Sequence, residues 1–186
     1  MDNFDPIKNL VSKENTPKIK EGINFVFEQN PEFEKVGTKE QYSEYLDTVF
    51  PESKIKDIVY HSSSELITEF KKQRDGLGQF FFSKGKDTIW KKMVSMEEEA
   101  KQVAVVLDVK NPKIELFDEN DHDGQSYRMR FAKDEGYDSV FIENNRNPED
   151  SERVVFNPSQ IHILGSQSDV EAFKSFIANQ SEKKDN

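Results

Sequence analysis

Hydrophobic positions near the start of the chain repeat at helical spacing. Ile23, Val26 and Phe27 follow an i, i+3, i+4 pattern, which predicts a helix within residues 19–30. A second amphipathic helix is expected from residue 38 to residue 50. Thr38 and Gln41 have the spacing of a capping box at its start.

Short β-forming runs dominate the rest of the chain. They are rich in valine, isoleucine and phenylalanine and are separated by turn residues, as is typical of strands. The expected strands are 57–61, 79–83, 103–109, 114–117, 139–142, 152–156 and 160–164. Asp87 is expected to cap a short helix between two of them, and Ser168 with Glu171 to cap a closing helix.

Helices that gather early and strands that gather late favour an α+β fold over alternating βαβ units. The pattern divides the chain into three parts. Residues 1–53 form an N-terminal extension with two helices, 54–165 form the core, and 166–186 form the closing helix and a charged tail.

Composition excludes several classes of function. The 186 residues carry a formal net charge of −10, which argues against general nucleic-acid binding. The absence of cysteine excludes disulfides, a thiolate nucleophile and cysteine zinc sites. No apolar run is long enough for a membrane helix, and no signal-peptide core is found at the start, so a soluble cytoplasmic protein without membrane partners is expected.

No metal site is expected either. The three histidines show no HExxH-like pairing. The acidic stretch 118–124 suggests a calcium loop, but aligning Gly124 with the invariant glycine places Arg130 where an EF-hand needs glutamate.

Three stretches carry the candidate chemistry. An apolar run starting at Asp57 ends at His61 and is followed by three serines, and a strand that stops at a polar cluster often opens into a site. The others are the aromatic run 78–83 and the run 152–161, which begins at Glu152.

In this order, the three stretches resemble the ADP-ribosyltransferase family, in its poly(ADP-ribose) polymerase branch. The likeness is closest to the transferase-like domain of the large polyvalent proteins of phages and other mobile elements, and covers roughly residues 41–165. It implies a compact ADP-ribosyltransferase fold with two small sheets packed face to face. NAD would be the substrate, in the cleft between them, with N-terminal helices and a C-terminal helix outside.

The resemblance also implies a reaction: ADP-ribose passes from NAD to an unknown acceptor, expected to be a protein, and nicotinamide is released. Single-unit transfer is expected, since nothing indicates a site for chain elongation. His61 would hold the adenosine ribose, and Ser62 and Ser63 would lie on the nicotinamide side. Ser62 stands where the family has glycine, which allows a closer approach of the ligand.

In the second stretch, Phe81 is expected to face the nicotinamide, with Ser83 at the strand end near the site. Alternation places Phe80 and Phe82 on the opposite face, in the core. The family has a tyrosine stacked on the nicotinamide ring from the next helix. Trp90 is the nearest aromatic residue here, and either cation–π stacking or a role in the core suits it.

The expected catalytic residues are Glu152 and His61, and Glu152 supplies the catalytic carboxylate. In the resembled family this glutamate hydrogen-bonds the nicotinamide-ribose 2′-hydroxyl and stabilises the developing oxocarbenium ion, which requires a fixed anion. Glu143, at the end of the preceding strand, is the rival. Two other functions stay open: a non-catalytic module that binds NAD, ADP-ribose or a protein, and an NAD glycohydrolase.

Overall fold

The computed structural model describes residues 19–71, 78–96, 99–120 and 128–184. Three expectations lie wholly or mostly outside these ranges. They are the polar segment 1–18, which the sequence predicts to be loosely ordered, the turn predicted at 76–78, of which only Gly78 is described, and the polar, acidic loop predicted at 118–125, of which 121–125 is not described.

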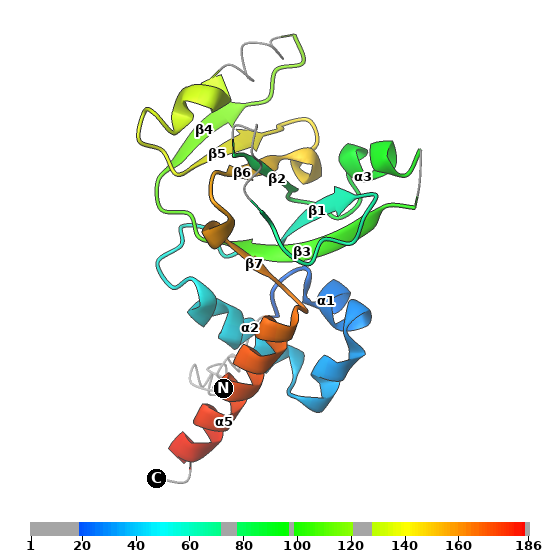
Figure 1. The fold of residues 1–186 in the computed structure, drawn as a ribbon, viewed down its shortest axis with the longest axis vertical. Coiled ribbons are helices and arrows are strands. Elements are labelled where there is room, and N and C mark those ends of the chain that lie inside the picture. Colours follow the sequence, from blue (N-terminus) through cyan, green and yellow to red (C-terminus); the bar gives the residue numbers. More distant parts are fainter. Residues whose placement is uncertain (1–18, 72–77, 97–98, 121–127, 185–186) are drawn as a thin grey trace, which may run out of the picture.

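Helices occupy both ends of the described part of the chain, and the strands lie between them (Figure 1). The helical elements are α1 (Ile23–Gln29), η1 (Pro31–Lys35), α2 (Lys39–Val49), α3 (Ile89–Val94), a turn of helix at 128–132, η2 (Pro148–Asp150), η3 (Pro158–Gln160) and α5 (Gln167–Lys184). The strands are β1 (Val59–Ser63), β2 (Phe80–Ser83), β3 (Lys101–Leu107), β4 (Pro112–Leu116), β5 (Ser139–Glu143), β6 (Glu152–Val155) and β7 (Ile161–Ile163). The α+β class is confirmed.

The expectation of two separate sheets is not met, because the seven strands of the described residues form one sheet in the order β4-β5-β6-β2-β1-β3-β7. Among these strands, the β4–β5 pair is parallel and the other pairs are antiparallel. Strands β1 and β2 join the two halves of the sheet through a single cross-strand pair, Tyr60 with Ser83. Their neighbours pair at four positions for β2–β6 and at five for β1–β3.

The sheet is covered on both faces around β3, which is buried from Val103 to Leu107. Its run of β-branched residues suits a central strand that faces apolar groups on both sides. Ala104 and Val106 face the helices, and Val103, Val105 and Leu107 belong to a cluster on the opposite face.

Helices α1, α2 and α5 share one core with the sheet, below its β3–β7 edge in Figure 1. Aromatic rings dominate this core. The ring centroids of Phe33 and Tyr42 lie 4.8 Å apart, and those of Tyr42 and Phe173 lie 5.0 Å apart. Such pairs add about 0.5–1.5 kcal/mol beyond area burial. The N-terminal extension and the closing helix therefore stabilise each other.

The capping box at Thr38 and Gln41 is confirmed. The one expected at Ser168 is wrong, because α5 already begins at Gln167. Ser166 precedes the helix, and its hydroxyl accepts the backbone N–H of Asp169 at 3.2 Å. A hydroxyl at the residue before a helix accepts a hydrogen bond from a backbone N–H of the first turn, which otherwise has no partner within the helix.

A fully buried carboxylate, Asp169, connects α5 to α2 and β7. It accepts hydrogen bonds from the hydroxyls of Tyr42 at 2.6 Å and Tyr45 at 3.0 Å. His162 Nε2 lies 2.7 Å from the same carboxylate, and the backbone N–H of Gly165 donates at 2.8 Å. Buried charge is tolerated where hydrogen bonds satisfy it in this way.

Alkaline pH is expected to destabilise the fold through its buried tyrosines. Burial and the nearby Asp169 charge raise the pKa of Tyr42 and of Tyr45 well above its usual value, and burial raises the pKa of Tyr60 to about 12. Above about pH 10 these groups ionise in the unfolded chain but stay neutral in the folded one. Each buried tyrosine should then lower the free energy of unfolding by up to about 1.4 kcal/mol per pH unit, until the pH reaches the pKa of that tyrosine in the folded state.

Urea unfolding between pH 9 and pH 11 measures this loss. The free energy of unfolding of Tyr42→Phe should fall less steeply with pH than that of the wild type. Tyr137→Phe, whose ring lies beneath Lys113 outside the Asp169 cluster, is the comparison variant. Parallel slopes for wild type and Tyr42→Phe would contradict the prediction.

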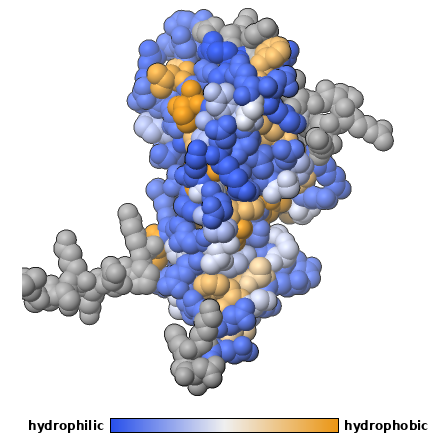
Figure 2. Space-filling view, turned by 90° about the vertical axis from the view of Figure 1, so that its left-hand side faces the viewer, coloured by the Kyte–Doolittle hydropathy of each residue, from blue (hydrophilic) through white to orange (hydrophobic). Residues whose placement is uncertain are grey.

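The outer surface on the β4 side is mostly hydrophilic, with separate small hydrophobic patches (Figure 2). Exposed apolar side chains of this end of the sheet include Ile114, Leu116 and Phe117. Among the described residues, no helix is long and apolar enough to cross a membrane.

Candidate functional site

The three candidate stretches, far apart in sequence, form adjacent strands of the sheet. β6 pairs with β2, and β2 pairs with β1. Within this group Glu152 lies directly opposite Ser83, and Ser83 lies directly opposite Tyr60. The predicted catalytic glutamate, the end of the aromatic strand and the histidine strand therefore meet in one row across the middle of the sheet.

Strand pairing also decides which candidates share a face. Residues paired across strands project to the same side, and successive residues alternate. Glu152, Ser83, Phe81 and Ser62 therefore lie on one face. By the same alternation, His61 and Ser63 belong to the opposite face. The sheet thus brings four candidates together on one side and presents His61 from the other.

His61 bridges the two strands where their ladder stops. Its Nδ1 lies 2.9 Å from the carbonyl oxygen of Phe81. A carbonyl can only accept, so Nδ1 carries the proton of this bond and Nε2 of the neutral ring is an acceptor. The imidazole ring packs edge-on against the Phe70 ring, with 5.3 Å between the ring centroids, and its centroid lies 5.8 Å from that of Phe82. These contacts fix its orientation.

Ser62 is supported by a residue that the sequence did not point out. Gln102 lies directly opposite it on β3, and its Nε2 donates to the Ser62 hydroxyl at 3.2 Å and to the carbonyl of Lys86 at 2.7 Å. The Gln102 Oε1 atom is buried and has no hydrogen-bond partner among the described residues. A buried, unpartnered acceptor beside the candidate residues is unusual. A lone amide at the start of a valine-rich strand was the available signal.

The other candidates differ in accessibility. Phe81 is 37% exposed, whereas Phe82 is buried and Phe80 packs on the core, as alternation predicted. Ser83 is buried and accepts from the Thr88 hydroxyl at 3.4 Å. The Ser63 hydroxyl donates to the carbonyl of Glu65.

Trp90 lies in α3, which packs against β1. Its side chain is outside the described part of the structure, so its expected stacking role stays a prediction.

The two rival carboxylates have different surroundings. Glu143 forms an ion pair with Arg153 at 2.9 Å, and the Arg153 guanidinium lies 4.5 Å from the centroid of the Phe141 ring. Arg153 Nη1 also donates to the backbone carbonyl of Glu152 at 3.0 Å. Glu143 is therefore part of a structural ion pair, and that ion pair holds the backbone of Glu152. The Glu152 side chain is half-buried on the other face, beside Ser83.

The helix expected to begin at Asp87 is held differently from the prediction. Thr88 is its N-cap residue but makes no side-chain capping bond. Instead, the backbone N–H of Ile89 donates to the carboxylate of Asp150 at 3.0 Å. The sequence alone could not show this, because the capping group lies 61 residues away in the chain.

The loop before α3 is attached to the segment that leads into Glu152. The N–H of Lys84 donates to the carbonyl of Ser151, and that of Gly85 to the carbonyl of Glu149, both at 2.8 Å. A Cβ atom at Gly85 would clash with the Glu149 side chain, including its Cβ at 2.8 Å, so a larger residue here would require Glu149 to move. Together with the bond from Ile89 to Asp150, these contacts couple α3 and the loop before it to the segment before β6 through three residues on each side.

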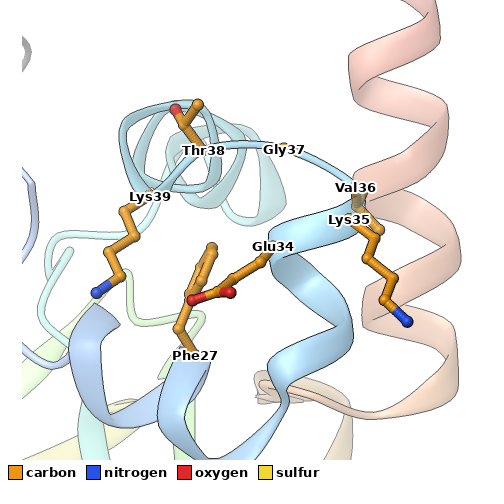
Figure 3. A pocket seen from close by; sticks show the side chains of 7 residues that line it. All are labelled: Phe27, Glu34, Lys35, Val36, Gly37, Thr38 and Lys39. Atoms are coloured by element: carbon orange, nitrogen blue, oxygen red, sulfur yellow. The ribbon is translucent and has the colours of Figure 1, made fainter.

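An open surface hollow of about 380 Å³ lies in the helical part of the chain, between α1, η1 and α2 (Figure 3). Its lining residues are Phe27, Glu34, Lys35, Val36, Gly37, Thr38 and Lys39. Lys39 Nζ lies 5.7 Å above the Phe27 ring. None of the predicted site residues lines the hollow, so it is separate from the β6-β2-β1 site.

The described residues contain no group of three histidine, aspartate or glutamate side chains placed to hold a metal ion. Searches of protein-family models, of curated proteins and of solved structures found no significant match to this chain. The function therefore has to be inferred from the residues and their arrangement.

Proposed function

We propose that this chain transfers ADP-ribose from NAD to an acceptor, expected to be a protein, and releases nicotinamide. The adjacency of β6, β2 and β1 carries the proposal, because three stretches chosen from sequence meet in one row of the sheet. The cytoplasm, which contains NAD, is the compartment that suits this reaction. The proposed fold is an ADP-ribosyltransferase fold whose two halves stay joined at Tyr60 and Ser83.

NAD would bind at the end of the β1–β2 pair, where the ladder stops beyond Tyr60 and Ser83. Side chains from both faces can reach a ligand at such an opening. His61 Nε2 would accept a hydrogen bond from a ribose hydroxyl. Ser62 and Ser63 would line the nicotinamide side, and the exposed ring of Phe81 would pack on the nicotinamide.

In the reaction, the glycosidic bond between the ribose C1′ and the nicotinamide nitrogen breaks. The nitrogen keeps the electron pair and leaves as neutral nicotinamide. Positive charge then develops on the ribose, and the Glu152 carboxylate would stabilise it. An acceptor nucleophile forms the new bond to C1′ and loses its proton, which Glu152 can take up.

A non-catalytic module that binds NAD or ADP-ribose is the second candidate. The observation that favours it is at Ser62, where glycine would leave room for the ligand. The Ser62 hydroxyl already accepts a hydrogen bond from Gln102, which holds this side chain beside the expected nicotinamide position.

Labelled NAD tests the proposal directly. The full chain is incubated with NAD labelled in its adenylate part, with and without a cell lysate, and both nicotinamide and labelled macromolecules are measured. Transfer requires nicotinamide release and labelled acceptors. Release without labelling identifies an NAD glycohydrolase, and binding without release identifies the non-catalytic module.

NAD binding itself should be visible through Trp90, the only tryptophan of the chain. If its indole stacks on the nicotinamide, the fluorescence changes on titration, and the melting temperature rises because NAD binds the folded state selectively. Trp90→Phe should remove the signal and weaken binding by at most about 2 kcal/mol. A folded protein with no shift at saturating NAD would contradict both candidate functions that bind NAD.

A further inference from the structure

Helix α3 and the turn after it expose a stripe of apolar side chains. Ile89 and Met93 are each 52% exposed, and Met96 is 85% exposed. They have i, i+4 and i+7 spacing, which places them along one side of the element. Methionine adapts its shape to different apolar partners and is common on surfaces that bind peptides.

The stripe begins beside a cluster of lysines in an otherwise acidic chain. Residues 84–92 contain four lysines and one aspartate, while the whole chain has a net charge of −10. Lys91 pairs with Asp87 at 2.9 Å. The remaining three, Lys84, Lys86 and Lys92, are exposed and have no ion-pair partner in the part of the chain that the structure describes.

The electrostatic effect of these lysines is felt locally. A hydrogen bond from Lys91 and the charges of Lys91, Lys86 and Lys92 hold the pKa of Asp87 below its usual value. The sequence turns acidic again at Glu97. Positive charge is therefore concentrated at the N-terminal end of the stripe.

The position of this surface connects it with the candidate site. Ile89, the first residue of the stripe, is bound through its backbone to Asp150, and Lys84 to Ser151. Asp150 and Ser151 immediately precede Glu152. A partner held on α3 would therefore be held at a fixed position relative to the proposed catalytic carboxylate.

We propose that the exposed side of α3 is a docking surface for an acidic amphipathic segment of a protein acceptor. This surface, the α3 docking surface, consists of Ile89, Met93 and Met96 with Lys84, Lys86 and Lys92. The identification of its occupant as the acceptor rests on the proposed function. Apolar side chains of the segment pack on the stripe, and its carboxylates face the lysines.

The apolar stripe favours a protein over a nucleic acid. Phosphate backbones are bound by positive charge, and bases by aromatic side chains or hydrogen-bonding groups. The methionines and the isoleucine offer neither. Apolar contact with flanking charges is instead how a groove or face recognises an amphipathic helix.

A defined peptide tests the docking surface without any need for catalysis. The probe is a fluorescein-labelled helical peptide with leucines at i, i+4 and i+7 and glutamates elsewhere, and a version with lysines replacing the glutamates is its counterpart. Anisotropy titration with the full chain should give at least tenfold tighter binding of the acidic peptide. Added salt should reduce that preference.

Two pairs of variants locate the binding. Met93→Glu should weaken binding of the acidic peptide at least tenfold. Ile114→Glu, which changes a similarly exposed apolar residue on β4, should leave that binding unchanged. Charge reversal of Lys84, Lys86 and Lys92 to glutamate should abolish the preference for the acidic peptide over the lysine peptide. The same reversal at the exposed Lys35, Lys133 and Lys174 matches the change in net charge and should leave it intact.

Equal affinity for both peptides, or equal effects of Met93→Glu and Ile114→Glu, would overturn the docking proposal. So would tighter binding of a single-stranded oligonucleotide that Met93→Glu leaves unchanged, or self-association of the chain through this surface in sedimentation. If the wild type releases no nicotinamide from NAD, the proposed function fails while the peptide titration still decides on docking. If the wild type does release nicotinamide, charge reversal of Lys84, Lys86 and Lys92 should reduce the labelling of the acceptor. The rate of nicotinamide release with water as the acceptor should stay within twofold of the wild-type rate.

Discussion

Glu152→Gln should slow nicotinamide release by about 10²–10³ and leave NAD affinity and folding nearly unchanged. The range is that of losing one preorganised electrostatic group in a transition state. Glutamine keeps the size and polarity of the side chain but removes the anion that would face the developing positive charge. Single-turnover release of nicotinamide, measured beside the melting curve of the variant, gives the rate and the stability separately.

Glu143→Gln is the matched control, since Glu143 ends β5 and Glu152 begins the neighbouring strand β6. Glu143 is paired with Arg153 on the other face of the sheet, so its loss should act through stability and change the rate by less than about tenfold. If Glu143→Gln abolishes turnover while Glu152→Gln does not, the catalytic carboxylate belongs to β5 and the reading of the last stretch is wrong.

Asp169→Asn should reduce the free energy of unfolding by about 3–5 kcal/mol, the range for breaking a buried charged network. The fully buried carboxylate accepts from two tyrosines, a backbone N–H and His162. An amide places a donor where donors already point, so at least one of them is left buried without a partner. Urea unfolding at pH 7 measures the loss.

Asp47→Asn provides the comparison on helix α2. Asp47 is 56% exposed and pairs with Lys20 at 2.8 Å, and such surface pairs contribute at most about 1 kcal/mol. A similar loss for both variants would show that Asp169 does not act as a buried acceptor, and the network would have to be reassigned.

Local patterns in the sequence predicted most elements but not their partners. Alternation separated Phe81 from Phe82, and the capping box marked the start of α2, because both depend on residues within one or two turns of the chain. The cap of α3 depends on Asp150, far along the chain, and no local pattern reveals it. The start of α5 was misplaced because Ser166 and Ser168 offer equivalent hydroxyls.

The candidate site shows the same limit. Residue types and order selected His61, Phe81 and Glu152, but only strand order shows that they lie on adjacent strands. Only strand register shows that His61 faces away from Glu152. Gln102 supports Ser62, and Arg153 supports the backbone of Glu152, through contacts that depend on the assembled sheet.

The core around Asp169 also bears on how the protein folds during synthesis. Tyr42 and Asp169 are 127 residues apart in the chain, and Phe173 completes the ring contacts around Phe33. Helices α1 and α2 are made before α5, so the part of their apolar surface that Phe173 covers stays exposed until residues 167–184 have been made. Exposed apolar surface of that kind invites chaperone binding or aggregation in a growing chain. Helix α5 is therefore the element that ends this exposure.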